Sequence, residues 1–431
     1  MRGREANTGP AERSSGLTAE GLTSSDPSQP LRQPRAAAGI KGALRRRLLP
    51  QIQRETRVIA WIQQYVQHPT LVWLFAAVGI FGTHMAFLTG LPVFFWFPDI
   101  ARVFGRGLIY ILATGVYCTG FIKDWMCLPR PAAPVRPITL DKAISLEYGF
   151  PSTHTANAVS IALHVIIFYH QFAHLWDGTS HLAVTLLAAG YAATISLSRI
   201  ISGMHSFTDV LGGLVLGVAV VLIYWGCLFT PFERYIHSVA AWIPPLLVGY
   251  AIIAVSVHTD PEGPCPCFDD SVAFIGACTG AYLGSWHYGM YLRDVANHTF
   301  PVMDPVSRSG SVRYLFWALR FVWGVGLLFG WRLMAKHICY TLLPPLYRVL
   351  ARALPFRRKF FHLARDYGGI PAEHITFFPS VLYLNAHTAS DPHTYKLPRY
   401  DVDIATKLIV YTGIGWLATM VIPLVNERLN L

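Results

Sequence analysis

The sequence predicts an all-α, polytopic helical membrane protein. Hydrophobic residues make up 53% of the 431 residues, charged residues make up only 14%, and the mean hydropathy is +0.39. Soluble domains carry about 25% charged residues, so much of this chain is too apolar for a water-exposed surface. In addition, apolar runs long enough to cross a bilayer, which takes about 20 helical residues, recur along the chain.

The N-terminal region is polar and differs from the rest of the chain. Residues 1–50 are rich in Arg, Gly, Pro, Ser and Ala, a composition that predicts a disordered tail. Within residues 51–69, Val58, Ile59 and Ile62 recur at helical spacing, downstream of a run of three arginines. This pattern predicts a helix lying in the membrane interface, with a helix packed on the water-facing side of the protein as the alternative.

The apolar runs predict about nine membrane spans. They lie at 70–96, 104–122, 154–170, 183–198, 207–229, 239–257, 272–291, 314–335 and 404–425. Residues 70–230 hold the first five spans and form one unit. Residues 231–431 add further spans and a polar, basic loop at 355–402, while 338–354 reads as a re-entrant or interfacial piece. No internal repeat is visible, so the usual cue for an inverted-repeat transporter is missing.

The charge balance is basic, with 35 Lys and Arg against 24 Asp and Glu and a formal net charge of +11. In a soluble protein such an excess points to nucleic acid. Here much of it lies in the N-terminal tail and in the late loop, where it would meet anionic headgroups. We therefore expect membrane lipids, and no nucleic acid, as partners. The sequence leaves the oligomeric state open.

Cysteine and histidine usage does not indicate a metal site. The seven cysteines form no CxxC pair and show no metal-ligand spacing, so no metal or other cofactor is predicted. Cys265 and Cys267 flank a proline in an acidic loop. We expect free thiols there, with a disulfide or lipidation as alternatives. His164 lies within an apolar run and is expected to be a hydrogen-bonded core histidine.

Three polar motifs interrupt this apolar chain at the ends of predicted spans. KDWMCLPRP (123–131) follows the second span, PSTH (151–154) begins the third, and SRIISGMHSFTD (198–209) joins the fourth to the fifth. Because the third span leaves the face that carries the first two motifs and the fourth span returns to it, all three motifs emerge on one side. Charged groups at membrane depth are costly and usually functional.

The first set of polar residues suits a phosphate group. Lys123, Arg130 and Arg199 supply three cations, and guanidinium groups match phosphate oxygens bidentately. Ser152 and Thr153 add hydroxyl and backbone N–H donors. Ser152 is at a predicted N-cap, so the positive end of the third helix dipole points toward the same place.

The remaining residues suit nucleophilic catalysis. His205 and Asp209 are four residues apart, so on a helix start the carboxylate can orient the imidazole and leave one ring nitrogen free to attack. His154 has no carboxylate at helical spacing and can act as a proton donor to a leaving alkoxide. A phosphohistidine intermediate would divide the displacement into two easier steps. No acidic cluster suggests Mg²⁺, so the cations themselves would neutralise the transition state.

At these residues the chain resembles the type 2 phosphatidate phosphatase and vanadium haloperoxidase superfamily, whose pattern is K-x6-RP, PSGH and SR-x5-H-x3-D. The matching residues are Lys123, Arg130, Pro131, Pro151, Ser152, His154, Ser198, Arg199, His205 and Asp209. Thr153 stands where the general pattern has glycine, which would allow a close backbone approach to phosphate. PSTH and the residues around His205 are similar to the branch of sphingosine 1-phosphate phosphatases and fungal long-chain-base phosphate phosphatases.

The resemblance implies a helical catalytic core of this type over residues 70–230. By the family's roles, His205 is the nucleophile, Asp209 its orienting partner and His154 the acid and base. The family's phosphate-binding roles fall on Lys123, Arg130, Ser152, Thr153 and Arg199. The implied activity is metal-independent hydrolysis of sphingoid long-chain-base 1-phosphates in the endoplasmic reticulum membrane.

Other functions stay open at this point. Phosphatidate phosphatase is the main enzymatic alternative, and other phosphate-ester phosphatases share the same core. A lipid-phosphate-binding or transport protein is the alternative outside catalysis. Such relatives should lack one of the two histidines or the aspartate, and this chain keeps His154, His205 and Asp209.

Overall fold

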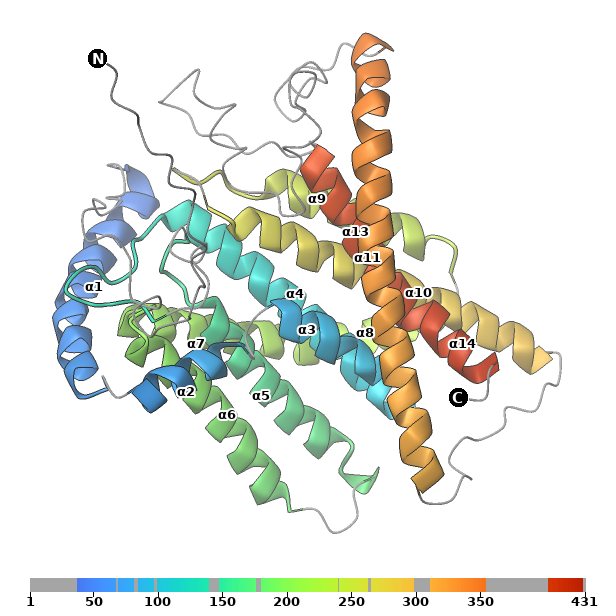
Figure 1. The fold of residues 1–431 in the computed structure, drawn as a ribbon, viewed down its shortest axis with the longest axis horizontal. Coiled ribbons are helices and arrows are strands. Elements are labelled where there is room, and N and C mark those ends of the chain that lie inside the picture. The colour runs from blue at the N-terminus through green and yellow to red at the C-terminus, as the bar shows by residue number, and fades with distance from the viewer. Residues whose placement is uncertain are drawn as a thin grey trace, which may run out of the picture.

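The fold is that of a computed structural model, and all of its described elements are helical, which confirms the predicted fold class (Figure 1). It describes residues 37–66, 69–80, 84–96, 99–138, 147–175, 180–238, 240–262, 265–297, 311–353 and 402–428. The first helices are α1 (Gly39–Tyr65), α2 (Pro69–Ile80), α3 (His84–Gly90), η2 (Leu91–Phe95), α4 (Asp99–Met126), α5 (Thr153–Gln171), η4 (Ala173–Leu175), α6 (His181–Ile201) and α7 (Phe207–Ile223). They are followed by η5 (Tyr224–Leu228), α8 (Phe229–His237), α9 (Ile243–Val257), α10 (Cys267–Asn297), α11 (Ser311–Ala353), α13 (Val402–Trp416), η9 (Leu417–Val421) and α14 (Ile422–Arg428).

Five helices within the described ranges are long and apolar enough to cross a membrane. They are Ala101–Met126, His181–Ile201, Phe207–Arg234, Leu315–Leu346 and Val402–Arg428. The predicted number of nine is therefore not reached by this criterion. The predicted span 70–96 is divided among α2, α3 and η2, because the sequence Gly90-Leu91-Pro92 does not continue a regular helix. The predicted re-entrant piece 338–354 instead continues α11 as far as Ala353, and the loop predicted at 355–402 lies almost wholly outside the described residues.

The main hydrophobic core lies between α4, α10, α13 and the long helix α11 (Figure 1). Ile111, Leu112 and Ile422 are fully buried in it. Within this core, His164 is held by Trp225, whose Nε1 donates to Nδ1 at 3.1 Å, and its Nε2 lies 3.1 Å from the Phe104 carbonyl. The prediction of a hydrogen-bonded core histidine is confirmed.

Two glycines bring α7 close to α5. A Cβ atom at Gly213 would collide with the Ser152 carbonyl, and one at Gly217 would collide with the Ala156 carbonyl. Ser160 completes the contact, since its Oγ donates to the Gly217 carbonyl at 3.2 Å. This close packing sets the first turn of α5, with PSTH, directly against the first turn of α7, which follows His205.

Helix α1 corrects the predicted N-terminal boundary. It begins at Gly39, so residues 39–50, assigned to a disordered tail from composition, are helical. Tertiary contacts hold this stretch: Arg45 Nε donates to the Met126 carbonyl at 2.6 Å, and Arg45 pairs with Glu262 at 2.7 Å. The helix then buries Ile52 and Ile59 against the protein. Composition could not show these contacts because the partners lie far away in sequence.

Candidate active site

The loop after α4 and the turn after α6 meet at one end of the helical bundle. Backbone N–H groups join the two segments: Ile138 donates to the Ser202 carbonyl at 2.8 Å, and Ser152 donates to the Asp209 carbonyl at 2.9 Å. The turn between α6 and α7 contains Gly203 with φ +69°, a conformation that disfavours any side chain. All three sequence motifs therefore contribute residues to the same region.

Lys123 and Arg130 share one carboxylate. Lys123 lies in the last turn of α4, and its Nζ is 2.8 Å from Oε2 of Glu147, which also lies 3.1 Å from Nη2 of Arg130. Arg130 additionally donates from Nε to the Glu147 carbonyl at 3.1 Å and from Nη1 to the Met204 carbonyl at 2.9 Å. Two of the three predicted phosphate-binding cations thus bind the same anionic group, the carboxylate of Glu147.

Arg130 also connects this cation pair to the predicted nucleophile. Its Nη1 lies 3.3 Å from Nε2 of His205, which is only 2% exposed. A guanidinium N–H can only donate, so Nε2 acts as the acceptor and the ring proton belongs on Nδ1. Burial, followed by the charges of Arg130 and Lys123, holds the pKa of His205 well below its usual range. The imidazole is therefore neutral, with its Nε2 lone pair on the side of the cations.

Asp209 lies on the opposite side of the His205 ring. Its Oδ2 is 3.6 Å from Nδ1 of His205, longer than a hydrogen bond but in ion-pair range. The same carboxylate accepts from Ser206 N–H at 2.8 Å, while Ser206 Oγ accepts from Asp209 N–H at 3.1 Å. This reciprocal pair is a capping box that starts α7. Asp209 is fixed by the helix start, and a small rotation of His205 would bring Nδ1 into hydrogen-bonding distance.

Ser152 and Thr153 begin α5, as predicted. Ser152 is the N-cap, and its Oγ accepts from the N–H of Thr155 at 3.4 Å. Thr153 donates from Oγ1 to Thr119 Oγ1 of α4 at 3.2 Å, which ties the start of α5 to the face of α4 that carries Lys123. Unsatisfied N–H groups at a helix start favour anions.

His154 and Arg199 are less tightly connected to the other predicted residues. His154 is half-buried in the first turn of α5, where the charges of Arg199, Glu147, Lys123 and Arg130 act on it. Arg199 is buried in the last turn of α6, with Nε donating to Ser198 Oγ at 3.2 Å and the guanidinium against Gly79 of α2. Among the described residues, no ion pair joins Arg199 to a carboxylate.

Glu147 is the site residue that the sequence motifs did not identify. It stands in the loop between the first two motifs, four residues before Pro151. A single glutamate in a polar loop carries no distinctive pattern, so only its contacts with Lys123 and Arg130 reveal it.

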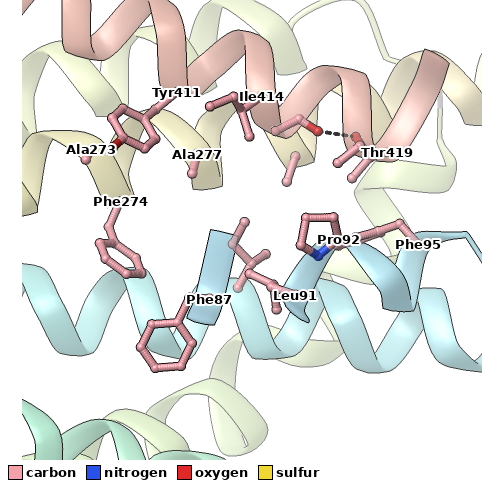
Figure 2. Close-up of a pocket in the computed structure, with 14 residues that line it drawn as sticks. Phe87, Leu91, Pro92, Phe95, Ala273, Phe274, Ala277, Tyr411, Ile414 and Thr419 are labelled. Atoms are coloured by element: carbon pink, nitrogen blue, oxygen red, sulfur yellow. Dashed lines mark hydrogen bonds between the residues drawn. The ribbon is translucent and has the colours of Figure 1, made fainter. Parts of the chain in front are cut away.

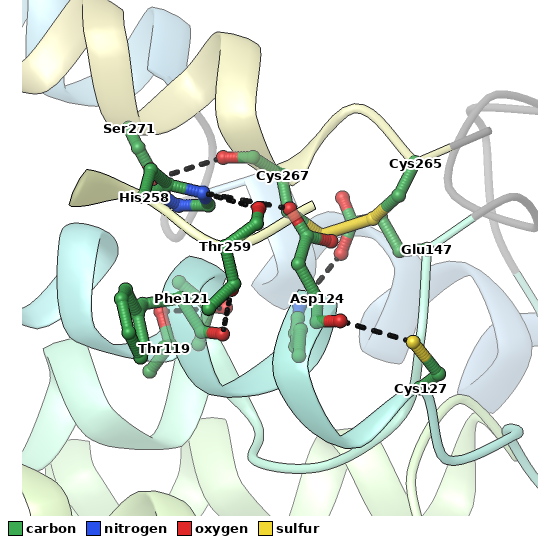
Figure 3. The surroundings of a disulfide bond; sticks show 12 residues. Thr119, Phe121, Asp124, Cys127, Glu147, His258, Thr259, Cys265, Cys267 and Ser271 are labelled. Atoms are coloured by element: carbon green, nitrogen blue, oxygen red, sulfur yellow. Dashed lines mark hydrogen bonds and ion pairs between the residues drawn. A yellow bond between two sulfur atoms is a disulfide. The ribbon is translucent and has the colours of Figure 1, made fainter. Parts of the chain in front are cut away.

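A second polar cluster lies next to Glu147 and the last turn of α4 (Figure 3). Asp124, Cys265 and Cys267 bring their side-chain oxygen and sulfur atoms within 4.8 Å of one another. The two cysteines form a disulfide, which corrects the expectation of free thiols. His258 faces Asp124 at 3.8 Å and lies 3.3 Å from Ser271 Oγ. Of these residues only Asp124 belongs to one of the three motifs, next to Lys123 in KDWMCLPRP.

A small apolar pocket, partly open to the surroundings, lies deeper in the bundle (Figure 2). Phe87 and Leu91 line one wall, Phe274 and Ala277 of α10 another, and Tyr411 of α13 a third. Its lining suits a hydrocarbon chain rather than a polar group.

Comparison with known proteins places the motifs in a family. The model of the PAP2 superfamily matches residues 104–233. A dihydrosphingosine 1-phosphate phosphatase of Schizosaccharomyces pombe is 31% identical over 89% of this chain and 90% of its own length. The dihydrosphingosine 1-phosphate phosphatase YSR3 of Saccharomyces cerevisiae is 31% identical over 64% of this chain and 65% of its own. Human sphingosine-1-phosphate phosphatase 2 is 23% identical over 88% of this chain and 84% of its own. No solved structure gives a significant match.

Proposed function

The chain belongs to the PAP2 superfamily, and from this premise we propose that it is a multi-pass membrane phosphatase that hydrolyses sphingoid long-chain-base 1-phosphates to the free base and phosphate. Two relatives that match most of its length, one from Schizosaccharomyces pombe and one from human, carry this activity in their names. The endoplasmic reticulum membrane is the proposed location.

One observation carries the mechanism: Arg130 contacts both His205 Nε2 and the carboxylate of Glu147. The carboxylate of Glu147 shows that Lys123 and Arg130 can bind an anion beside the neutral imidazole of His205. A phosphate ester bound in the same place would have its phosphorus within reach of the Nε2 lone pair.

The proposed reaction has two steps. In the first, His205 Nε2 bonds to phosphorus and the bond to the ester oxygen breaks, while His154 protonates the departing alkoxide. Asp209 stabilises the imidazolium that forms. In the second, His154 takes a proton from water, which attacks phosphorus and releases phosphate from His205. Lys123, Arg130, Arg199 and the N–H and hydroxyl groups of Ser152 and Thr153 neutralise the charge on the transferring group.

The position of the site supports a lipid substrate. It lies at the ends of α4, α5, α6 and α7, three of which include membrane-spanning stretches. A phosphate in the headgroup layer can reach such a site while its tail stays among apolar helices. We further propose that α10 and α13 form a lateral wall that selects single-chain lipids, because they line the apolar pocket.

The test is phosphate release by the purified full-length protein in detergent with EDTA present. Dihydrosphingosine 1-phosphate is compared with phosphatidate, and His205→Ala is measured beside the wild type. Strong release from the sphingoid substrate that is lost in the variant is the expected result. A preference for phosphatidate would contradict the substrate class, and no release from either lipid would favour the lipid-phosphate-binding alternative.

A further inference from the structure

Glu147 is an anion inside a site built to attract anions. Its Oε2 alone accepts both Lys123 Nζ at 2.8 Å and Arg130 Nη2 at 3.1 Å. The side chain is 19% exposed, whereas that of Lys123 is 2% exposed. The Glu147 side chain is therefore more exposed than either of the two cations that it contacts.

Glu147 is ionised at neutral pH. Burial by itself raises the pKa of this carboxyl, but the charges of Lys123 and Arg130 outweigh burial and bring the pKa down to about 2. Both cation contacts end on Oε2, and none of the described residues bonds to Oε1. Oε1 of Glu147 can therefore accept a hydrogen bond from a further cationic group.

The amine separates two classes of phosphate ester. A sphingoid-base 1-phosphate carries an ammonium group as well as its phosphate, whereas phosphatidate has no ammonium group. The carboxylate oxygen Oε1 of Glu147, next to the two cations that would hold the phosphate, is a group that an ammonium ion can donate to.

We propose that Glu147 is a specificity-determining residue that binds the 2-ammonium group of the substrate. This inference rests on the proposed function and names the group by which the site distinguishes its substrate. The ammonium-bearing carbon is adjacent to the carbon that carries the ester oxygen. A phosphate held by Lys123 and Arg130 therefore brings the ammonium close to the carboxylate that those cations already contact. Before substrate binds, the same carboxylate occupies the anion position.

The experiment compares two lipids that differ in the amine. Full-length wild type and Glu147→Gln are assayed in detergent on dihydrosphingosine 1-phosphate and on octadecyl phosphate, which has the chain but no ammonium group. In the variant, kcat/KM for the amine-bearing lipid should fall roughly tenfold or more, because a charged hydrogen bond is lost. For octadecyl phosphate it should stay equal or rise, because a competing anion has been removed.

Glu55→Gln is the matched control. Glu55 accepts from Thr208 at the start of α7, at 2.9 Å from N and 2.7 Å from Oγ1, and contacts neither cation. This variant should keep the wild-type ratio of the two kcat/KM values.

Two results would overturn the inference. Glu147→Gln could lower both kcat/KM values by the same factor or abolish both, in which case the residue supports the site rather than the amine. Glu147→Gln could also leave both kcat/KM values equal to those of the wild type. The wild-type arm tests the proposed function separately, since a wild type that releases no phosphate from dihydrosphingosine 1-phosphate contradicts the activity whatever the variant does.

Discussion

Arg130 Nη1 lies 3.3 Å from Nε2 of His205, the ring nitrogen opposite the one that faces Asp209. Arg130 therefore donates to the lone pair on one side of the imidazole, and the carboxylate of Asp209 faces Nδ1 on the other side at 3.6 Å. When a bound anion accepts the hydrogen bonds of the Arg130 guanidinium, the Nε2 lone pair of His205 is no longer engaged and faces that anion. In the proposed mechanism, Arg130 therefore links substrate binding to activation of His205.

Replacing Arg130 by lysine should lower kcat/KM on the sphingoid substrate by roughly 100-fold, the usual loss for one stabilising donor. An ammonium group cannot reach Met204, Glu147 and His205 at once in the planar fork geometry of guanidinium. Initial rates of phosphate release measure this effect. Arg136→Lys is the control, because Arg136 contacts Gln63 through its backbone. Equal rates for Arg130→Lys and wild type would contradict the proposed role.

Asp209→Asn should lower kcat by roughly 10⁴-fold while leaving the protein folded. Asparagine accepts a helix-cap hydrogen bond as well as aspartate does, so the start of α7 is kept, but it does not stabilise an imidazolium. Rates and thermal unfolding in detergent should be measured together. A variant that loses stability and activity in parallel would assign Asp209 to the fold alone.

Gly213→Leu should separate α7 from α5 and lower kcat roughly 100-fold, since small displacements of reacting groups have effects of that size. A side chain at position 213 meets the Ser152 carbonyl and Thr155, at the start of the helix that carries His154. Gly190→Leu on α6 is the matched control, because a Cβ there meets nothing within 4 Å. Similar activity in the two variants would show that this close approach is not needed.

The imidazole of His205 should titrate well below pH 6.5. Its pKa is lowered by burial and by Arg130 and Lys123, so the neutral, nucleophilic form persists as the pH falls past the usual range. NMR of isotope-labelled histidines, with His205→Gln to assign the signal, measures this directly and avoids the second ionisation of the substrate near pH 6. A midpoint at or above 6.5 would contradict the described environment.

Ala277→Phe should fill part of the apolar pocket and reduce kcat/KM several-fold for a sphingoid phosphate with a long chain, compared with a short-chain analogue. Ala183→Phe on the exposed face of α6 is the control. Unchanged chain-length preference in Ala277→Phe would count against α10 and α13 as the selecting wall.

Much of this protein could be predicted from local patterns. The apolar runs determine that it is helical and spans membranes, because such runs have few other stable arrangements in lipid. The order of the three motifs determines that Lys123, His154 and His205 share one face, since successive spans alternate in direction. The helix starts at Ser152 and Ser206 are also local, because a cap and its partners are three residues apart.

Only the tertiary structure decided which side chains meet at that face. It brought Glu147 between Lys123 and Arg130, turned Arg130 toward His205 and extended α1 back to Gly39 through Arg45. These features depend on contacts between residues far apart in the chain, where the free energy comes from a partner that no local pattern contains. Residue types and spacing therefore determined the chemistry available to this protein, and packing decided how its charges are paired.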